Sequence, residues 1–427
     1  MIKPVQQCRI CGNKNLVSIL NLGEQVLTGV FPRTLGEHIT RGPLELVKCA
    51  DEGADTCGLV QLKHSYDLGE MYGKNYGYRS GLNRSMVQHL KNRVAKILSL
   101  VSLHSGDLII DIGSNDSTLL QAYPKEDLQL VGIDPTGIKF KKYYPKHVRL
   151  IADFFSAEKV KEHFPRQPAR VVSSISMFYD LEAPVDFMRQ VYDVLAEDGI
   201  WVFEQSYMPE MLKKNSYDTI CHEHLEYYGL KQIKWMTDKV GFKIIDLEFN
   251  EANGGSFAVT VAKRSNKSFP EAKAAIEKTL AQERARGLAT LRPYEEFKKQ
   301  VYRHKKELGD LIKDIKSRGQ KIFGYGASTK GNVILQFCGL SAGDIPCIAE
   351  VNQDKFGCYT PGSGIPIISE ADAKAQRPDY FLVLPWHFRG NILEREKEYL
   401  KAGGNLIMPL PEISIDTYKT LSGGQGG

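Results

Sequence analysis

Short runs of apolar residues recur along the middle of the chain, and segments with helical apolar spacing lie between them. One such segment, 85–103, places apolar residues every three or four positions, which predicts an amphipathic helix. Strands that alternate with helices are typical of a parallel sheet covered on both faces. The runs that we interpret as buried strands are 107–113, 128–133, 148–151, 171–175 and 200–204.

The pattern changes after residue 228. Two strand-like segments, 242–249 and 256–263, predict an antiparallel hairpin at the edge of the sheet. Residues 267–318 are charged and have helical spacing, so they can connect two domains as long amphipathic helices. A second strand, glycine-rich loop and helix then follow at 321–337, which indicates a smaller α/β unit. We therefore divide the α/β chain into segments 1–80, 81–265, 266–319 and 320–420.

Composition narrows the class of protein. The 427 residues include 56 Lys and Arg against 51 Asp and Glu, a net charge of +5, so a polybasic nucleic-acid coat is excluded. No stretch approaches 18 uncharged apolar residues, and the start, Met1-Ile-Lys-Pro-Val5, lacks the apolar core of a signal peptide. We expect a cytoplasmic protein that binds neither nucleic acid nor membrane.

Four of the eight cysteines lie within the first 57 residues, in two pairs. Cys8 and Cys11 form a C-x2-C motif, and Gly12 allows the tight turn that the motif needs. Cys49 and Cys57 supply a second pair at wider spacing. In a reducing compartment this clustering favours a metal, and four thiolates suit a closed, structural Zn²⁺ site. The alternatives are four unrelated buried thiols or a zinc ribbon that binds nucleic acid.

Acidic residues follow three successive predicted strands. Asp111 and Gly113 end the first, and Gly113 lets a ligand approach the backbone closely. Asp134 ends the next strand about twenty residues on, where a carboxylate can accept both hydroxyls of a ribose. Asp153 ends the third, where it can meet an adenine amino group while Phe154 packs on the ring. This order of residues predicts a nucleoside-binding edge of the sheet.

The loop after Gly113 favours S-adenosylmethionine (SAM) over a nicotinamide dinucleotide. It lacks the G-x-G-x-x-G spacing that seats a pyrophosphate on a helix N-terminus, although we expect a helix to begin near Thr118. Asp111 and Asp116 would repel phosphate but suit the sulfonium and ammonium of SAM. Capping of the helix is the alternative role of Asp116. The predicted SAM site comprises Asp111, Gly113, Asn115, Asp116, Asp134, Asp153 and Phe154.

The densest cluster of titratable groups spans Tyr217 to Tyr228 and contains His222-Glu223-His224. It follows the strand at 200–204, and ligands of open α/β sheets bind at the C-terminal ends of strands. The spacing does not match the H-E-x-x-H motif of a metal-binding helix. For any one histidine, a hydrogen-bonded structural role is the alternative. The cluster as a whole predicts a chemical centre.

Further motifs are distributed along nearly the whole chain. They read CGLVQL at 57–62, YGYRSGLNRSM at 76–86, DIGSNDSTLL at 111–120, SMFYDLEAP at 176–184, CHEHLEYY at 221–228, NGGSFAV at 253–259 and GYGASTKGN at 324–332. Together with the cysteine pairs, they resemble the SAM-dependent NDP-sugar C-methyltransferases that build branched deoxysugars. The resemblance implies a zinc-binding N-terminal domain (1–80), a central Rossmann-like SAM domain (81–265), a helical connector (266–319) and a smaller Rossmann-like nucleotide-sugar-binding domain (320–420).

The resemblance also implies methylation of a carbon beside the ketone of a nucleotide-linked 4-keto hexose. The histidine that ends the H-E-H run is taken as the base in the family, which is His224 here, with Glu223 and His222 as close supports. Cys221 stands where a tyrosine is frequent, and Ser117 stands where a glycine is usual.

Such a base has a physical reason. A C–H beside a ketone must be deprotonated before the carbon can accept a methyl group, and the resulting enolate must be stabilised. Histidine can be neutral near pH 7, and Glu223 can orient the ring of His224. Tyr76, Tyr78 and Tyr179 can donate hydrogen bonds to sugar oxygens, and each is at least as readily a packing residue.

The glycine-rich loop at 324–331 has the character of a diphosphate site, because backbone N–H groups and Lys330 lie at a helix start. A purely structural turn is the alternative. The predicted substrate-binding residues of this unit are Ser328, Thr329, Lys330, Asn332, His387 and Arg389.

We therefore expect a SAM-dependent enzyme with structural Zn²⁺ that methylates C-3 of a GDP- or dTDP-linked 4-keto-6-deoxyhexose, as a monomer or small homo-oligomer. The alternatives are methylation at C-5 or at O or N of a related sugar, a zinc-ribbon binding module, and a SAM fold without catalysis.

Overall fold

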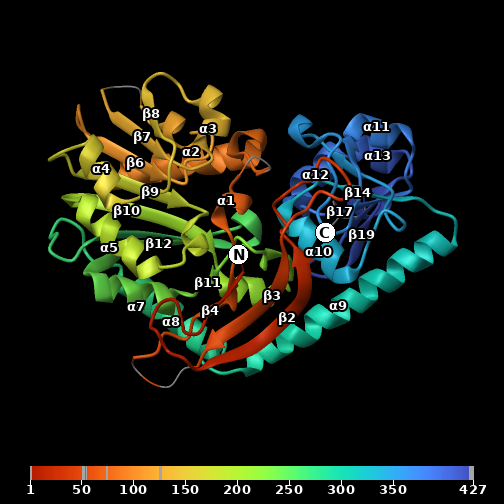
Figure 1. Cartoon of the computed structure of the whole chain (residues 1–427), viewed down its shortest axis with the longest axis horizontal. Helices are drawn as coiled ribbons and strands as arrows, with labels where there is room; N and C mark the ends of the chain where they lie inside the picture. Colours follow the sequence, from red (N-terminus) through yellow and green to blue (C-terminus); the bar gives the residue numbers. More distant parts are fainter. Residues whose placement is uncertain (1, 51–52, 54, 74–75, 125–126, 423–427) are drawn as a thin grey trace.

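The computed structural model describes residues 2–50, 53, 55–73, 76–124 and 127–422. Three main sheets organise this part of the chain (Figure 1). The N-terminal hairpin of β2 (Leu16–Val26) and β3 (Arg41–Cys49) lies between the central unit and the C-terminal unit. No helix in these ranges is long and apolar enough to cross a membrane.

The central sheet confirms the predicted α/β fold. Its strands are β6 (Leu108–Ile112), β7 (Gln129–Ile133), β8 (Val148–Ile151), β9 (Ala169–Ile175), β10 (Leu195–Ser206), β12 (Phe242–Asn250) and β13 (Ser256–Lys263). Their order is β12-β13-β10-β9-β6-β7-β8. The pairs β8-β7, β7-β6, β6-β9 and β9-β10 are parallel, whereas β13 runs antiparallel to both β10 and β12. The late hairpin therefore lies at the sheet edge, as its sequence predicts.

Alternate residues of the central strands bury opposite faces of the sheet. Ile109 packs with the apolar face of α2 (Arg84–Leu100), which the spacing at 85–103 predicts. Ile110, the next residue, packs on the other side with α5 (Pro184–Val194) and α7 (Leu230–Val240). The other helices of this unit are α3 (Gly137–Phe140), α4 (Ala157–His163) and α6 (Met208–Lys213).

The helix expected near Thr118 is not formed. The chain makes only a short 3-10 turn, η2 (Leu120–Ala122), after a loop in which Asn115 and Ser117 have φ of 50° and 63°. Left-handed residues cannot continue a right-handed helix. The Asp116 carboxylate also accepts the Thr118 hydroxyl at 2.5 Å and so competes with helical backbone bonding.

The N-terminal segment forms an antiparallel sheet that its turn-rich sequence does not predict. Its strands are β11 (Glu226–Tyr227), β4 (Val60–Leu62), β3 and β2, in that order. β11 comes directly after the His-Glu-His run, so the sheet incorporates a strand from far along the chain. The remaining elements of the segment are β1 (Lys3–Pro4), β5 (His64–Ser65) and α1 (Leu68–Met71).

The predicted connector contains α8 (Lys273–Ala285) and α9 (Arg292–Ser317). α9 runs along the outside of the C-terminal unit (Figure 1). Its buried residues, which include Phe297 and Leu308, recur at helical spacing and belong to a core that also contains Leu46 of the N-terminal sheet. The N-terminal sheet and the C-terminal unit thus share one hydrophobic core.

The C-terminal unit is a second α/β sheet in the order β16-β15-β14-β17-β18-β19, parallel except for β19. Its strands are β14 (Ile322–Tyr325), β15 (Ile348–Glu350), β16 (Ile367–Ser369), β17 (Tyr380–Val383), β18 (Asn405–Met408) and β19 (Ser414–Asp416). Its helices are α10 (Thr329–Cys338), α11 (Glu370–Ala375), α12 (Arg389–Arg395), α13 (Lys397–Lys401) and α14 (Tyr418–Ser422).

We expect Trp201→Ala to lower the free energy of unfolding by about 3–5 kcal/mol, because a fully buried aromatic leaves a cavity. Trp201 is fully buried on β10, stacks on Phe203 with ring centroids 4.2 Å apart, and donates from its indole N–H to the Ser174 hydroxyl. Denaturant unfolding measures the change. Ile138→Ala, at a side chain that is 73% exposed, should stay within about 0.5 kcal/mol of the unaltered protein.

Candidate active site and metal centre

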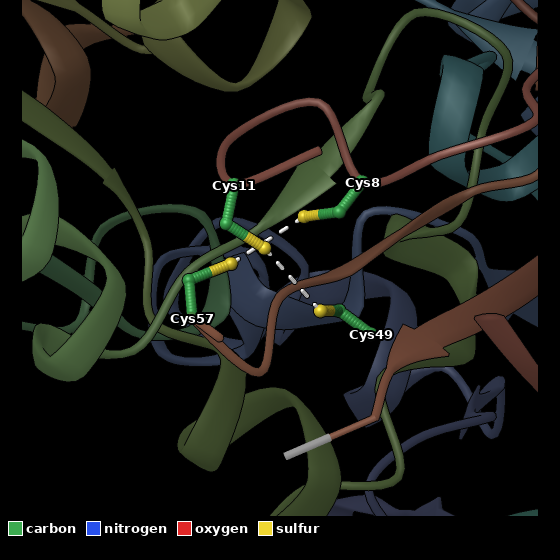
Figure 2. Close-up of side chains that lie close together, drawn as sticks. All are labelled: Cys8, Cys11, Cys49 and Cys57. Atoms are coloured by element: carbon green, nitrogen blue, oxygen red, sulfur yellow. Dashed lines mark hydrogen bonds between the residues drawn. The ribbon is translucent and has the colours of Figure 1, made fainter. Parts of the chain in front are cut away.

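Four cysteine sulfurs converge beside the N-terminal sheet (Figure 2). Cys8 and Cys11 flank a tight turn, Cys49 ends β3, and Cys57 lies just before β4. All four Sγ atoms lie within 4.8 Å of one another, and Cys8 Sγ is 3.4 Å from Cys57 Sγ. This spacing fits the shell of four thiolates around a tetrahedral Zn²⁺. The predicted ligand set is therefore brought together, and the four thiols are not unrelated.

A cavity of about 260 Å³ opens at the C-terminal ends of β6, β7 and β9. Ligands of open α/β sheets bind at this edge. Several residues that the sequence singles out line it, namely Tyr76, Tyr78, Asp111, Gly113, Asn115, Asp134 and Phe154. Asp116 and Asp153 are not among the lining residues.

Two buried carboxyl groups face the cavity from successive strands. Asp111 accepts the Ser173 hydroxyl at 2.6 Å, and burial raises its pKa to about 7. Asp134 accepts the Thr136 hydroxyl at 2.6 Å and the Asn115 backbone N–H at 2.7 Å. These partners fix both groups at the ends of their strands.

A side chain at Gly113, on the floor of the cavity, would be crowded and would strain the backbone. Gly113 has a φ of 76°, and a Cβ there would lie 3.0 Å from Met177. Because no helix follows this loop, no helix N-terminus is available to hold a pyrophosphate. An acidic cavity without that feature fits the cationic, phosphate-free SAM better than a dinucleotide.

Asn115 and Asp116 bind the neighbouring segment at 79–81, which reaches the cavity wall at Ser80. The Asn115 side-chain oxygen accepts the Ser80 N–H at 3.0 Å, and Asp116 accepts the Gly81 N–H at 2.9 Å and lies 3.8 Å from Arg79 Nε. Both side chains are therefore occupied by protein contacts. Neither partner set could be read from spacing along the chain.

The third acidic position differs from its neighbours. Asp153 is exposed and pairs with Lys159 at 2.5 Å, so its carboxylate does not face the cavity. Phe154, which is 44% exposed, does line it. An exposed aromatic ring at a cavity wall is available for stacking on a planar ligand.

His224 is half-buried and lines a small second pocket together with Tyr179 and Thr219. Its Nδ1 lies 2.8 Å from the Thr219 carbonyl oxygen, so Nδ1 carries the proton and Nε2 keeps its lone pair. Its ring packs on Tyr179 with centroids 4.3 Å apart, and Asp180, the next residue along the chain, lines the cofactor cavity. Burial, aided by the charge of Lys330, lowers the pKa of His224 to about 3 and favours the neutral imidazole.

The expected supports of His224 lie elsewhere. The Thr219 carbonyl, not Glu223, orients the ring. Glu223 turns toward the N-terminal segment, where the Thr28 hydroxyl donates to it at 3.4 Å, and burial raises the pKa of this carboxyl. His222 is fully buried, with its ring edge-on to Tyr66 at 4.6 Å between centroids. The segment forms a tight turn, in which the His224 N–H donates to the Cys221 carbonyl at 3.1 Å, and this turn separates His222 from His224.

The tyrosines have different positions. Tyr76 is half-buried and lies 5.5 Å from Tyr72 between ring centroids, and burial raises its pKa well above the usual value, so it remains a donor. Tyr78 is 47% exposed at the cavity mouth. Tyr179 is buried against His224 and packs as the sequence alternative allows.

The glycine-rich loop of the C-terminal unit meets the other two units. Ser328 caps α10 by accepting the Gly331 N–H at 3.0 Å, and the Asn332 amide donates to the Thr28 carbonyl at 2.7 Å. Thr329 lies at the same junction, near Gly29 and Glu223. These contacts give the loop a structural role in joining the units.

The remaining residues that the sequence predicts to bind the diphosphate differ in their partners. Lys330 Nζ donates to the Asn253 carbonyl at 2.7 Å. Arg389 forms a two-pronged ion pair with Asp416, at 2.6 and 3.0 Å, which directs its guanidinium away from the junction. His387 is half-buried and its Nδ1 has no partner in the described part of the chain. Sequence proximity to a strand end did not reveal the Asp416 partner.

Sequence reasoning missed one pair in the cavity wall. Asp180 and Tyr72 both line it, and the Tyr72 hydroxyl donates to Asp180 Oδ2 at 2.8 Å. Burial raises the pKa of Asp180 well above its usual range. The available signal was the place of Asp180 within the motif at 176–184, where it ends the short helix η4 (Phe178–Asp180) that follows β9.

Family models match three parts of the chain. The model described as "Putative zinc binding domain" matches residues 8–72, "Methyltransferase domain" matches 86–247, and "C-methyltransferase C-terminal domain" matches 251–411. C-methyltransferase NovU of Streptomyces niveus is 31% identical over 421 residues, covering 97% of this chain and 98% of that protein. The chain belongs to the C-methyltransferase family. It is a SAM-dependent C-methyltransferase, and the four-cysteine cluster is consistent with a structural zinc.

Solved structures of other proteins are similar to part of the methyltransferase. A SAM-dependent methyltransferase from Clostridium acetobutylicum ATCC 824 is 10% identical, with a TM-score of 0.32, over 42% of this chain and 92% of that one. The CurJ carbon methyltransferase is 12% identical, with a TM-score of 0.32, over 43% of this chain and 56% of that one.

We expect the purified methyltransferase to contain about one zinc ion per chain, as a closed four-thiolate site does. Cys57→Ser should remove most of this zinc because three thiolates leave the shell open. Elemental analysis of the two proteins measures the loss. Cys338→Ser, which changes a half-buried thiol of α10, should keep the full metal content, and equal loss from both variants would contradict the assignment.

We expect SAM to bind about tenfold more weakly at pH 6 than at pH 8, because a carboxyl with a pKa of about 7 loses its charge over this range. The protonated Asp111 no longer attracts a cation. Titration calorimetry across the range tests this, with Asp111→Asn expected to bind weakly and without pH dependence. Asp186→Asn, at an exposed aspartate, should behave like the unaltered enzyme. A pH-independent affinity of the unaltered enzyme would refute the role of Asp111.

Proposed function

We propose that the enzyme transfers a methyl group from SAM to C-3 of a nucleoside-diphosphate-linked 4-keto-6-deoxyhexose, with GDP or dTDP as the nucleotide. Family membership and the motifs at 76–86, 176–184 and 221–228 support a sugar substrate of this kind. The observation that carries the proposal is the neutral imidazole of His224, which packs on Tyr179 next to the cavity-lining Asp180 and has Nε2 unprotonated.

This imidazole fits carbon as the methyl acceptor. Oxygen and nitrogen acceptors already hold a lone pair, whereas a carbon beside a ketone must first lose a proton. In the proposed reaction, Nε2 of His224 removes the proton from C-3, and the C–H electron pair becomes the C-3–C-4 double bond of an enolate. The Nδ1–H bond to Thr219 keeps Nε2 directed and stabilises the imidazolium that forms.

The cofactor pocket gives the reaction its direction. Bound SAM supplies an electrophilic methyl group whose sulfur retains the C–S electron pair on transfer. Asp134 is positioned to accept the ribose hydroxyls, Phe154 to stack on the adenine, and Asp111 to attract the positive charge. Gly113 allows the cofactor to lie close to β6. Proximity of the two reactants then contributes much of the rate.

Tyr76 and Tyr72 are proposed to hold the sugar. Both line the cavity, and burial keeps both phenols protonated at neutral pH. The nucleotide is proposed to extend toward the junction with the C-terminal unit, where the backbone N–H groups that begin α10 and the His387 ring lie. Arg389 and Asn332 remain predicted contacts of the nucleotide, and each also has a protein partner.

We expect His224→Ala to lower both methyl transfer and SAM-independent deuterium incorporation at C-3 by at least about 100-fold, the usual contribution of a general base. Incubation of the 4-keto sugar in deuterium oxide, followed by mass and NMR analysis, measures the exchange. The control is His104→Ala, at a surface histidine, which should retain full activity. A His224→Ala variant that methylates at the unaltered rate would favour O- or N-methylation instead.

The substrate itself is tested with a panel of GDP-, dTDP- and CDP-linked 4-keto-6-deoxysugars. We expect a product that is heavier by the mass of a single CH₂ unit, because C–H is replaced by C–CH₃, with the new methyl signal attached to C-3. A methyl signal on C-5 or on oxygen would replace the proposed position.

A further inference from the structure

Lys330 reaches from the C-terminal unit into the central unit. It lies in the first turn of α10, and its side chain is half-buried at the junction. Its ammonium donates to the main-chain carbonyl of Asn253 at 2.7 Å. No ion pair joins it to a carboxylate of the described residues, although Asp218 is the nearest acidic neighbour to influence it. One carbonyl leaves other N–H groups of the ammonium available for a ligand.

The turn that holds Lys330 also reaches the cofactor cavity. Asn253, Gly254 and Gly255 have φ of 54°, 94° and 130°, a run of left-handed residues between β12 and β13. The Asn253 amide donates to the hydroxyl of Ser176 at 3.2 Å, and Ser176 lines the cavity with a φ of 57°. Strained backbone of this kind persists where the surroundings fix it, frequently at functional sites.

A second set of contacts links Lys330 to the base. α10 packs on the short helix η5 (Tyr217–Thr219), whose Thr219 carbonyl orients His224. The charge of Lys330 helps to lower the pKa of His224, as expected for a cation close to the imidazole. Lys330 therefore lies near both the base and the cavity wall.

The enolate needs such a cation. Removal of a proton beside the ketone places a full negative charge on the ketone oxygen, while Asp180 and Glu223 lie close by with raised pKa values. When those carboxyls ionise they become negative, so they cannot offset the negative charge of an oxyanion. Cys221 beside them is a buried thiol and supplies no positive charge. A positioned ammonium in a partly dry site is far more effective than water.

We propose that Lys330 is a catalytic residue whose ammonium contacts the ketone oxygen of the sugar and stabilises the enolate. This assignment rests on the proposed function. As His224 Nε2 takes the C-3 proton, the C-4=O π electrons move to oxygen beside Lys330 Nζ. When C-3 bonds to the methyl group, the electrons return to re-form the ketone. The C-terminal unit thereby completes the active site.

The test is SAM-independent deuterium incorporation at saturating substrate, with the best sugar of the panel. We expect Lys330→Met to slow exchange by about 100- to 1,000-fold, the usual loss of an oxyanion-stabilising group, with SAM affinity unchanged by calorimetry. Lys330→Arg should recover part of the rate because it retains the charge. Lys401→Met, at an exposed lysine of the same unit, should match the unaltered enzyme.

Two outcomes would overturn the assignment. One is exchange by Lys330→Met at the unaltered rate with unchanged binding of the nucleotide sugar. The other is the same unaltered rate at saturation combined with weaker binding of the nucleotide sugar, which would make Lys330 a phosphate anchor. If thermal unfolding shows that Lys330→Met does not fold, Lys330→Gln and Lys330→Arg provide the same comparison. Failure of the proposed function is distinct, since the unaltered enzyme would then exchange no deuterium with any sugar of the panel.

Discussion

Two backbone hydrogen bonds at Leu225 determine where His224, the proposed base, lies. The Leu225 N–H donates to the Tyr179 carbonyl in the central unit at 2.8 Å, and its carbonyl accepts the Leu62 N–H of the N-terminal sheet at 2.8 Å. His224 directly precedes this residue. Because Leu225 is almost fully buried, breaking either bond would leave a polar group unpaired, at a cost of about 1–3 kcal/mol. The imidazole is therefore fixed between two units.

The metal centre supports the same loop. Cys57 lies three residues before β4, and β4 pairs with β11, the strand that follows His224. The Cys57 carbonyl also accepts the Gln232 amide of α7 at 2.8 Å. A closed zinc site at this position restricts β4 and, through the sheet, the active-site loop. The four-cysteine cluster is therefore consistent with a structural zinc that stabilises this part of the fold.

Contacts at the junctions between the units bring together groups that no single unit contains. Thr28 of the N-terminal segment contacts both Glu223 and Asn332, which belong to different units. Asn253 in turn joins Lys330 to Ser176 at the cofactor cavity. A shared core along α9 holds these surfaces together. The arrangement is compatible with the proposed reaction, in which SAM on the central sheet and a sugar between the units meet at His224.

The sequence alone determined the central and C-terminal sheets and the clustering of the four cysteines, because apolar runs, helical spacing and the C-x2-C motif act over short distances. It did not determine the N-terminal sheet, whose fourth strand, β11, comes from residue 226, nor the missing helix after Asp116. Partners such as Thr219 for His224 and Asp416 for Arg389 depend on tertiary packing. Only the folded chain decides which side chain of the loop at 221–225 faces which unit.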